Sequence, residues 1–291
     1  MEVLRSLLFV PGNREDMLQK SLQLSPDILV PDMEDSVPAS QKIVARDCIR
    51  NFLSYFQAES RNVIPRINSL TTGMLEEDLV AVVGKGILGV SVGKIDFPEE
   101  IDQISKLLDN LERTTCVPIG STKLIPWIET ARGVLNAVAI CQSSPRILGV
   151  AFGAEDFTSD MGVPRSEGGE ELFFARNAVA LAARAARIEA LDTPYVNFRD
   201  LDGLKDESVK ARRLGFRGKF AIHPGQISVI NDSFSPSSEE INYAREVLGA
   251  IKEAELKGKG ATSLDGKMID APVVERARKL LAIAEIIEEN S

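Results

Sequence analysis

Eight apolar, strand-like runs alternate with segments of helical periodicity, and this alternation constrains the fold more than any other feature. The runs cover residues 6–10, 27–33, 62–67, 89–95, 123–128, 147–152, 194–198 and 219–223, the seventh being the weakest. Strands that alternate with amphipathic helices pair in parallel, and eight such units suffice to close a barrel. We therefore predict an α/β protein with a (β/α)8 TIM barrel. Helices are expected at 167–190 and 200–214, among other places.

An open, doubly wound sheet is the alternative fold. A dinucleotide-binding version would need a Gly-x-Gly-x-x-Gly turn after the first strand, and the sequence has none there. With 291 residues, 44% of them hydrophobic, the chain is long enough for one large barrel core.

The last part of the chain exceeds what a barrel needs. Residues 236–256 read as a helix, 257–266 as a Gly- and Lys-rich loop, and 272–289 as a last helix that opens at Pro272. We expect a barrel over 1–235 and a C-terminal helical extension over 236–291. Such an extension commonly serves as a lid or a subunit contact.

Charge and composition exclude several function classes. A net charge of −9 and a pI near 4.9 disfavour a nucleic-acid or anionic-membrane surface. The three cysteines form no Cys-x-x-Cys pair, the apolar run 7–10 is too short for a signal peptide, and no stretch approaches the length of a membrane span. We expect a soluble, cytoplasmic protein.

Polar residues close most of the apolar runs. In a parallel barrel these residues meet at the carboxyl ends of the strands, where active sites form. They are Asp32, Glu34, Asp35, Arg66, Asn68, Lys94, Asp96, Glu129, Glu155, Asp156 and His223. Helix capping is the preferred interpretation for Asn68, Asp96 and Glu155.

Glu129 and Asp156 have the placement of metal ligands. Each lies where a strand-like run gives way to a helix, on neighbouring strands that can bring both carboxylates to one ion. A hard divalent ion held by two protein oxygens keeps open positions that can polarise a carbonyl. The sequence therefore predicts an enzyme with a metal site.

Seven motifs in order resemble the citrate lyase beta-subunit-like family of the HpcH/HpaI aldolase superfamily. They are RSLLFVPG (5–12), PDMEDSV (31–37), PRIN (65–68), IETA (128–131), GAED (153–156), AIHP (221–224) and DGKMID (265–270). The resemblance implies a (β/α)8 barrel, usually trimeric or hexameric, and a magnesium-dependent carbon–carbon lyase.

The resemblance also implies roles for individual residues. It makes Glu129 and Asp156 the Mg²⁺ ligands, with Glu129 also touching substrate, and Arg66 the cation that holds the oxo-acid oxygens. Asp32, Glu34 and Asp35 match an acidic motif that would position metal-bound water, although a structural acidic turn is the plainer interpretation. Arg66 suits this task because a planar two-donor fork matches a carboxylate.

Further roles concern the rest of the substrate. Asp270 matches an acid that, in lyase relatives, reaches a neighbouring subunit's site and transfers the enolate proton, with Asp265 as its rival. Arg14 and Lys20 match the segment that binds the CoA or acyl-carrier arm, or are ordinary surface charges. His223 is expected to be buried and hydrogen-bonded at the mouth of the barrel. Trp127 is expected to lie in the core or in the wall of the pocket.

Three functions follow. The first is cleavage or formation of a 3-hydroxyacyl-CoA thioester, such as malyl-CoA or citramalyl-CoA, with acetyl- or propionyl-CoA and an α-keto acid as the fragments. The second is the beta subunit of a citrate lyase complex that acts on a citryl-acyl-carrier protein, or else a malyl-CoA thioesterase or malate synthase-like enzyme. The third is a barrel that binds without turnover.

Overall fold

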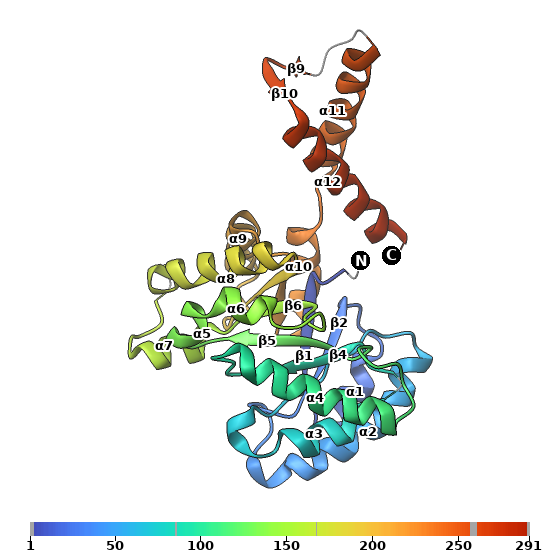
Figure 1. Cartoon of the computed structure of the whole chain (residues 1–291), viewed down its shortest axis with the longest axis vertical. Helices are drawn as coiled ribbons and strands as arrows, with labels where there is room; N and C mark the ends of the chain where they lie inside the picture. The colour runs from blue at the N-terminus through green and yellow to red at the C-terminus, as the bar shows by residue number, and fades with distance from the viewer. Residues whose placement is uncertain (1–2, 85, 167, 257–260, 290–291) are drawn as a thin grey trace. The chain divides into compact units, whose positions relative to one another are not determined.

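The computed structural model describes residues 3–84, 86–166, 168–256 and 261–289. Eight parallel strands form a closed barrel in the order β1 to β8, so the predicted TIM barrel is confirmed (Figure 1). The pairing of Leu7 in β1 with Phe220 in β8 closes it. The strands are β1 Ser6–Pro11, β2 Ile28–Asp32, β3 Arg66–Ile67, β4 Gly89–Val92, β5 Lys123–Ile128, β6 Gly149–Phe152, β7 Glu189–Asp192 and β8 Gly218–Ala221.

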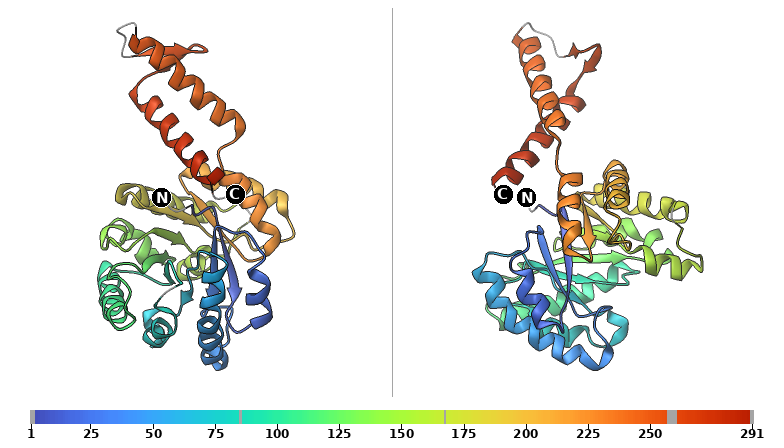
Figure 2. Two further views of the ribbon diagram at one scale, coloured as in Figure 1. Left: turned by 90° about the vertical axis from the view of Figure 1, so that its right-hand side faces the viewer. Right: turned by 180° about the vertical axis from the view of Figure 1, so that it is seen from behind.

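Helices follow the strands and surround the barrel, as two further views show (Figure 2). They are α1 Glu15–Ser21, α2 Lys42–Ala58, α3 Leu75–Val82, α4 Pro98–Thr114, α5 Ala131–Leu135, α6 Ala137–Gln142, α7 Ala154–Met161, α8 Phe173–Ala186, α9 Leu201–Leu214 and α10 Ile227–Phe234. Among the described residues, short 3₁₀ helices lie at Ala39–Gln41, Leu70–Thr72, Glu170–Leu172 and Pro224–Gln226. Pro98 opens α4 where its missing N–H costs nothing, and the Glu100 carboxylate accepts the Phe97 N–H at 2.8 Å.

The barrel interior is filled by apolar side chains from alternate strand positions. Three aromatic rings form its centre: Trp127 lies 4.4 Å from Phe220 between ring centroids, and Phe9 lies 5.1 Å from Phe220. Trp127 is buried, and its indole N–H donates to Ser91 Oγ at 2.7 Å. The interior of the barrel is therefore a packed core.

The seventh strand differs from the prediction. The sequence interpretation placed a helix over 167–190 and a strand over 194–198, whereas α8 ends at Ala186 and β7 covers Glu189–Asp192. Arg187 adopts a left-handed backbone, with φ +62°, which stops the helix early. The short strand Glu-Ala-Leu-Asp follows an Ala-rich helix and carries no alternating pattern of its own, so helix and strand were indistinguishable there. Residues 194–198 are instead part of the loop that follows β7.

Leu4–Ser233 form the barrel unit, whereas Val3 and the chain from Phe234 onward are assigned to a second compact unit. It contains α11 Ser238–Leu256, a hairpin of β9 Thr262–Leu264 and β10 Lys267–Ile269, and α12 Ala271–Glu289. Val247 and Ile251 of α11 pack with Val274 and Ala277 of α12 in its small core. The loop predicted over 257–266 is wrong at 262–264, which form a strand, and its residues 257–260 lie outside the described residues.

None of the helices in the described part of the chain combines the length and apolarity needed to span a membrane.

Candidate active site

Glu129 is a buried carboxylate directly after β5. Only 5% of the residue is exposed, and Oε1 accepts the backbone N–H of Lys94 at 2.7 Å. Burial, followed by the negative charges of Asp156 and Glu34, raises the pKa of Glu129 to about 8. A cation bound here would offset the unfavourable burial of the Glu129 carboxylate and its repulsion by the neighbouring negative charges.

Two glycines leave the space that this carboxylate occupies. A Cβ on Gly153, which precedes α7, would overlap Oε2 of Glu129. A Cβ on Gly93, which follows β4, would lie 2.8 Å from Oε1 of Glu129 and 3.1 Å from Oε1 of Glu34. Gly93 follows β4 and Gly153 follows β6, the two neighbours of β5. Their backbones can approach the Glu129 carboxylate closely only because glycine has no side chain.

Asp156 lies in the first turn of α7. The helix start is held by the Ala154 N–H, which donates to Thr193 Oγ1 at 3.2 Å. Oδ1 of Asp156 lies 3.6 Å from Nζ of Lys94, and the Asp156 side chain is 40% exposed. The start of the helix that carries Asp156 is therefore anchored, while the Asp156 side chain remains partly accessible to solvent.

Lys94 contacts both predicted metal ligands, one through its backbone and the other through its ammonium. It has φ +58°, a left-handed conformation that a residue with a side chain rarely adopts. From the sequence, Lys94 is only a polar residue at a strand end, because no sequence pattern reveals a lysine with a left-handed backbone.

Arg66, from β3, is surrounded by acids. Its Nε and Nη2 donate to both oxygens of Asp32, each at 2.7 Å, and Nη1 donates to Asp35 at 2.9 Å. Nη1 also lies 3.3 Å from Glu34, and the guanidinium stacks 4.4 Å from the Phe9 ring centroid. The resulting fork is rigid, which suits it to orient a planar ligand.

The three acids of the motif at 32–35 have different environments. Burial by itself would raise the pKa of Asp32, but the charge and hydrogen bonds of Arg66 outweigh it, and the pKa of Asp32 is lowered. Burial raises the pKa of Glu34 to about 7, because the charge of Arg66 compensates it less and Asp35 and Asp32 add repulsion. Lys42 fixes the turn, since its ammonium donates to the carbonyls of Met33 and Glu34.

A pocket of about 410 Å³ lies at the carboxyl ends of the strands and collects these groups. Its charged lining consists of Arg66 and the acids Asp32, Asp35, Glu129, Glu155 and Asp156. The remaining lining is mostly apolar and comprises Phe9, Pro11, Trp127, Gly153, Ala154, Pro194, Val196 and Ile222, with the hydroxyls of Ser36 and Thr193. The predicted residues Glu129, Asp156 and Arg66 therefore share one cavity.

The acids fit a magnesium ion of the kind that keeps several waters. Within the described residues, no three His, Cys, Asp or Glu side chains converge closely enough to form a complete cage. Mg²⁺ is commonly held by one or two carboxylates plus water and substrate oxygens, so a pair is sufficient. Glu129 lies buried beside Gly93 and Gly153, and its carboxylate, which accepts the Lys94 N–H, can serve as an oxygen ligand.

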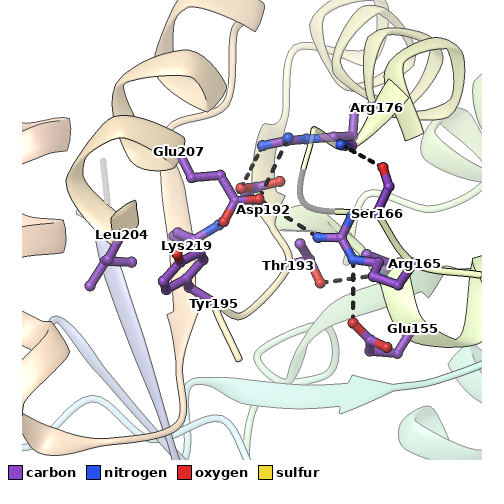
Figure 3. A network of polar contacts seen from close by, with 12 residues as sticks. Glu155, Arg165, Ser166, Arg176, Asp192, Thr193, Tyr195, Leu204, Glu207 and Lys219 are labelled. Carbon is purple, nitrogen blue, oxygen red and sulfur yellow. Dashed lines mark hydrogen bonds and ion pairs between the residues drawn. The ribbon is translucent and has the colours of Figure 1, made fainter. Parts of the chain in front are cut away.

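A second polar cluster supports this edge of the barrel from outside. Lys219 of β8 and Asp192 of β7 are both fully buried and lie 2.6 Å apart, and Arg176 of α8 contacts the same Asp192 oxygen at 2.8 Å. Figure 3 shows Glu207 beside these groups and Arg165 reaching Glu155, which lines the pocket. Sequence reasoning missed this cluster, although a lysine within the apolar run 219–223 was a signal of a buried ion pair.

The candidate residues for the CoA arm lie on the surface of α1 and its preceding turn. Arg14 pairs with Asp16 at 2.9 Å, and the Lys20 side chain is 79% exposed. Neither lines the pocket. His223 is exposed and stacks on Phe198 with 5.0 Å between ring centroids, so the expectation that it is buried was wrong. The expected hydrogen bonding is present, because its Nδ1 accepts the Gly225 N–H at 3.1 Å.

Asp270 and Asp265 belong to the second unit. Asp270 precedes α12, and its Oδ1 accepts the Val273 N–H at 3.3 Å, as a helix cap does. Asp265 occupies the turn of the β9–β10 hairpin with φ +48°. The choice between the two as a proton-transferring acid stays a prediction.

Comparison with known proteins identifies the family. The model described as HpcH/HpaI aldolase/citrate lyase matches residues 5–224. The chain belongs to this family. Its described fold and its paired acids beside Arg66 agree with the resemblance seen in the motifs.

Individual relatives cover nearly the whole chain. The citrate lyase subunit beta of Leuconostoc mesenteroides subsp. cremoris is 38% identical over 96% of this chain and 93% of its own length. The mitochondrial citramalyl-CoA lyase of Homo sapiens is 36% identical over 98% of this chain and 86% of its own. The names of these relatives indicate a carbon–carbon lyase.

A solved structure shows the same fold with ligands. CitE from Mycobacterium tuberculosis, in complex with magnesium, acetoacetate and coenzyme A, superimposes with a TM-score of 0.78 and 28% identity. The match covers 96% of this chain and 97% of that one.

Proposed function

We propose that this protein catalyses magnesium-dependent, reversible cleavage of a 3-hydroxyacyl-CoA thioester, such as malyl-CoA or citramalyl-CoA. The products would be acetyl- or propionyl-CoA and an α-keto acid. The proposal depends on one observation. Glu129, which is buried, Asp156, whose side chain is 40% exposed, and Arg66 all line the same pocket at the carboxyl ends of the strands. Magnesium in the related CitE complex supports the choice of ion.

Cleavage breaks the bond between the thioester α-carbon and the hydroxyl-bearing carbon. The hydroxyl proton passes to solvent water as its carbon becomes the keto carbon. The electrons of the broken carbon–carbon bond pass to the thioester enolate, and a proton from an acid of the site then adds to the α-carbon. A magnesium ion, when bound by Glu129 and Asp156, would supply positive charge at the developing keto oxygen.

The chain's own residues orient the fragment. Arg66 is held by Asp32 and stacked on Phe9, so a substrate carboxylate meets a guanidinium that is already oriented. The Asp35 side chain is 60% exposed and is the contact of Arg66 that can most easily yield to the substrate. Asp32, Glu34 and Asp35 would also orient metal-bound water.

Asp270 is proposed as the acid that transfers the proton to the α-carbon of the enolate. Replacing Asp270 by Asn should abolish α-keto acid release and leave Mg²⁺ binding unchanged, while Asp265→Asn should retain activity. The opposite pattern would transfer the role to Asp265. If both variants are fully active, neither acid of the C-terminal unit is required.

The main test compares α-keto acid release from malyl-CoA, citramalyl-CoA and citryl-CoA, with Mg²⁺ and with EDTA. Glu129→Gln should reduce the Mg²⁺-dependent rate by about 100-fold or more, because it removes a charged ligand. Glu99→Gln is the matched control, since Glu99 is exposed on α4. Full activity of Glu129→Gln would refute the proposed site.

The second candidate is the beta subunit of a citrate lyase complex, which the 38% identical Leuconostoc protein favours. It predicts turnover of a citryl group only on an acyl-carrier protein, with a transferase subunit present. Cleavage of a free CoA thioester by the isolated protein would decide for the first candidate. We also propose a homotrimer or hexamer, Arg14 and Lys20 as contacts of the CoA arm, and a cytoplasmic location, in keeping with three free cysteines.

A further inference from the structure

The helix that carries Asp156 has no side-chain cap of its own. The N-cap residue of α7 is Gly153, which forms no side-chain cap, and a Cβ at this position would overlap the Glu129 carboxylate. Serine, threonine, aspartate and asparagine are preferred at N-caps because their side chains accept hydrogen bonds from helix N–H groups. Glu129 therefore excludes from position 153 every residue whose side chain could cap α7.

The neighbouring strand supplies a hydrogen bond to the start of this helix. The pairing of β6 with β7 ends with Ala151 beside Leu191. Beyond that pair, the N–H of Ala154, the first residue of α7, donates to Thr193 Oγ1 at 3.2 Å. Thr193 is only 2% exposed and lines the pocket. Its hydroxyl therefore links α7 to the end of β7, where the strands themselves no longer pair.

Thr193 follows a residue that is firmly held. The carboxylate of Asp192 is fully buried and accepts hydrogen bonds from Lys219 Nζ at 2.6 Å and from Arg176 Nη2 at 2.8 Å (Figure 3). Asp192 and Lys219 are also partners in the pairing of β7 with β8. Charge-assisted hydrogen bonds are stronger than neutral ones, so the backbone next to Thr193 is fixed in the barrel wall.

A second contact holds the first turn of α7 more weakly. Arg165, in the loop after α7, lies with Nε 3.3 Å from Oε1 of Glu155. The Glu155 side chain is 59% exposed, and an ion pair this open to solvent contributes little. The buried hydroxyl of Thr193 is therefore the contact that matters more for the turn that contains Asp156.

Resting on the proposed function, in which Asp156 binds Mg²⁺, we infer that Thr193 is the residue that positions Asp156 for the ion. Thr193 acts through α7 and is not itself a ligand. Its hydroxyl fixes the first turn of the helix, and with it the direction of the Asp156 carboxylate relative to Glu129. Residues that orient a metal ligand in this way typically change metal affinity by about 10- to 100-fold.

The test measures Mg²⁺ affinity on the full chain by calorimetry, without a thioester, so that turnover does not enter the readout. Thr193→Val keeps the shape of the side chain and removes the hydroxyl, and it should weaken Mg²⁺ binding by about tenfold. Thr193→Ser keeps the hydroxyl and should bind Mg²⁺ as the parent does. Parental affinity in Thr193→Val would overturn the inference.

Thr158→Val is the matched control. Thr158 is a second buried threonine beside the site, 3% exposed, but its hydroxyl donates to the carbonyls of Ala154 and Glu155 within α7 itself. Its loss leaves the link between α7 and β7 in place, so Mg²⁺ affinity should stay unchanged. Equal weakening in Thr158→Val and Thr193→Val would show a general effect of lost packing in α7, and the inference would fail.

A double-mutant cycle separates positioning from support of the fold. In the Asp156→Asn background, Thr193→Val should cause no further loss of Mg²⁺ affinity, because the ligand that it positions is already absent. The rise of Tm with Mg²⁺ reports the weak binding of these variants. The same loss with and without Asp156 would overturn the inference. Thr193→Ala replaces the valine variant in the cycle if the latter does not fold.

The proposed metal site fails by a different result. No Mg²⁺ binding by the parent, or parental affinity in Asp156→Asn, would overturn the proposed site together with this inference. Mg²⁺ binding that is weakened by Asp156→Asn but not by Thr193→Val would overturn the inference alone.

Discussion

The backbone N–H of Lys94 donates to Oε1 of Glu129 at 2.7 Å, and it does so from a left-handed backbone with φ +58°. The hydrogen bond orients the buried carboxylate, while the ammonium of the same residue lies 3.6 Å from Asp156. A residue with a side chain in this conformation costs free energy, so an unusual backbone coincides with the candidate metal ligands.

Substitutions at Lys94 should distinguish the effect of its backbone conformation on stability from the effect of its side chain. Lys94→Gly keeps the N–H and relieves the backbone, so its free energy of unfolding should stay within about 1 kcal/mol of the parent. Lys94→Val places a β-branched residue at positive φ and should destabilise the protein by about 1–3 kcal/mol. Urea denaturation measures both, and a Val variant as stable as the Gly variant would contradict the backbone conformation.

The space at Gly153 should control metal binding without any change of charge. Gly153→Ala forces the Glu129 carboxylate to move and should weaken Mg²⁺ binding by about tenfold, measured by calorimetry. Gly249→Ala is the matched control, because a Cβ at Gly249 in α11 meets nothing within 4 Å. Unaltered Mg²⁺ affinity in Gly153→Ala would argue that Glu129 is not a ligand.

The buried pair of Lys219 and Asp192 should be costly to break on one side. Lys219→Met leaves a buried carboxylate with Arg176 as its remaining close cation and should destabilise the protein by about 3–5 kcal/mol. The double variant Lys219→Met, Asp192→Asn should recover part of this loss, because it removes the unbalanced charge. Lys210→Met on the exposed surface of α9 is the control. Equal stability of the single and double variants would exclude this electrostatic explanation.

Acid should weaken a cluster at Glu112. Burial would raise the pKa of this carboxylate, but hydrogen bonds from Arg146 and from the N–H groups of Thr122 and Gly120 lower it to about 2. A pKa that is lower in the folded state contributes stability above the unfolded value of about 4.5, and this contribution is lost as the pH falls from about 5 toward 2.

The loss amounts to about 3 kcal/mol for the pKa difference. In Glu112→Gln the unfolding free energy should depend less on pH across this range, although the variant is less stable at neutral pH. Thermal unfolding at a series of pH values measures the effect. An identical slope in parent and variant would show that Glu112 does not cause it.

The sequence determined the barrel because its information is local and repeated. Strand and helix periodicities recur eight times, and only parallel pairing satisfies them. Polar residues at strand ends then identified Glu129, Asp156 and Arg66, since a closed parallel barrel brings all such ends to one face. The seventh strand was misplaced, because the short segment Glu189–Asp192 has no alternation and the end of α8 depends on a left-handed Arg187.

Only the tertiary structure decided how these groups are paired. Asp32 and Asp35 form ion pairs with Arg66, and Lys219 forms a buried ion pair with Asp192. Lys94 contacts both candidate metal ligands. These partners are between 27 and 62 residues apart in the chain, so no local pattern records them. These pairings depend on burial and on distances between strands, which exist only once the barrel has closed.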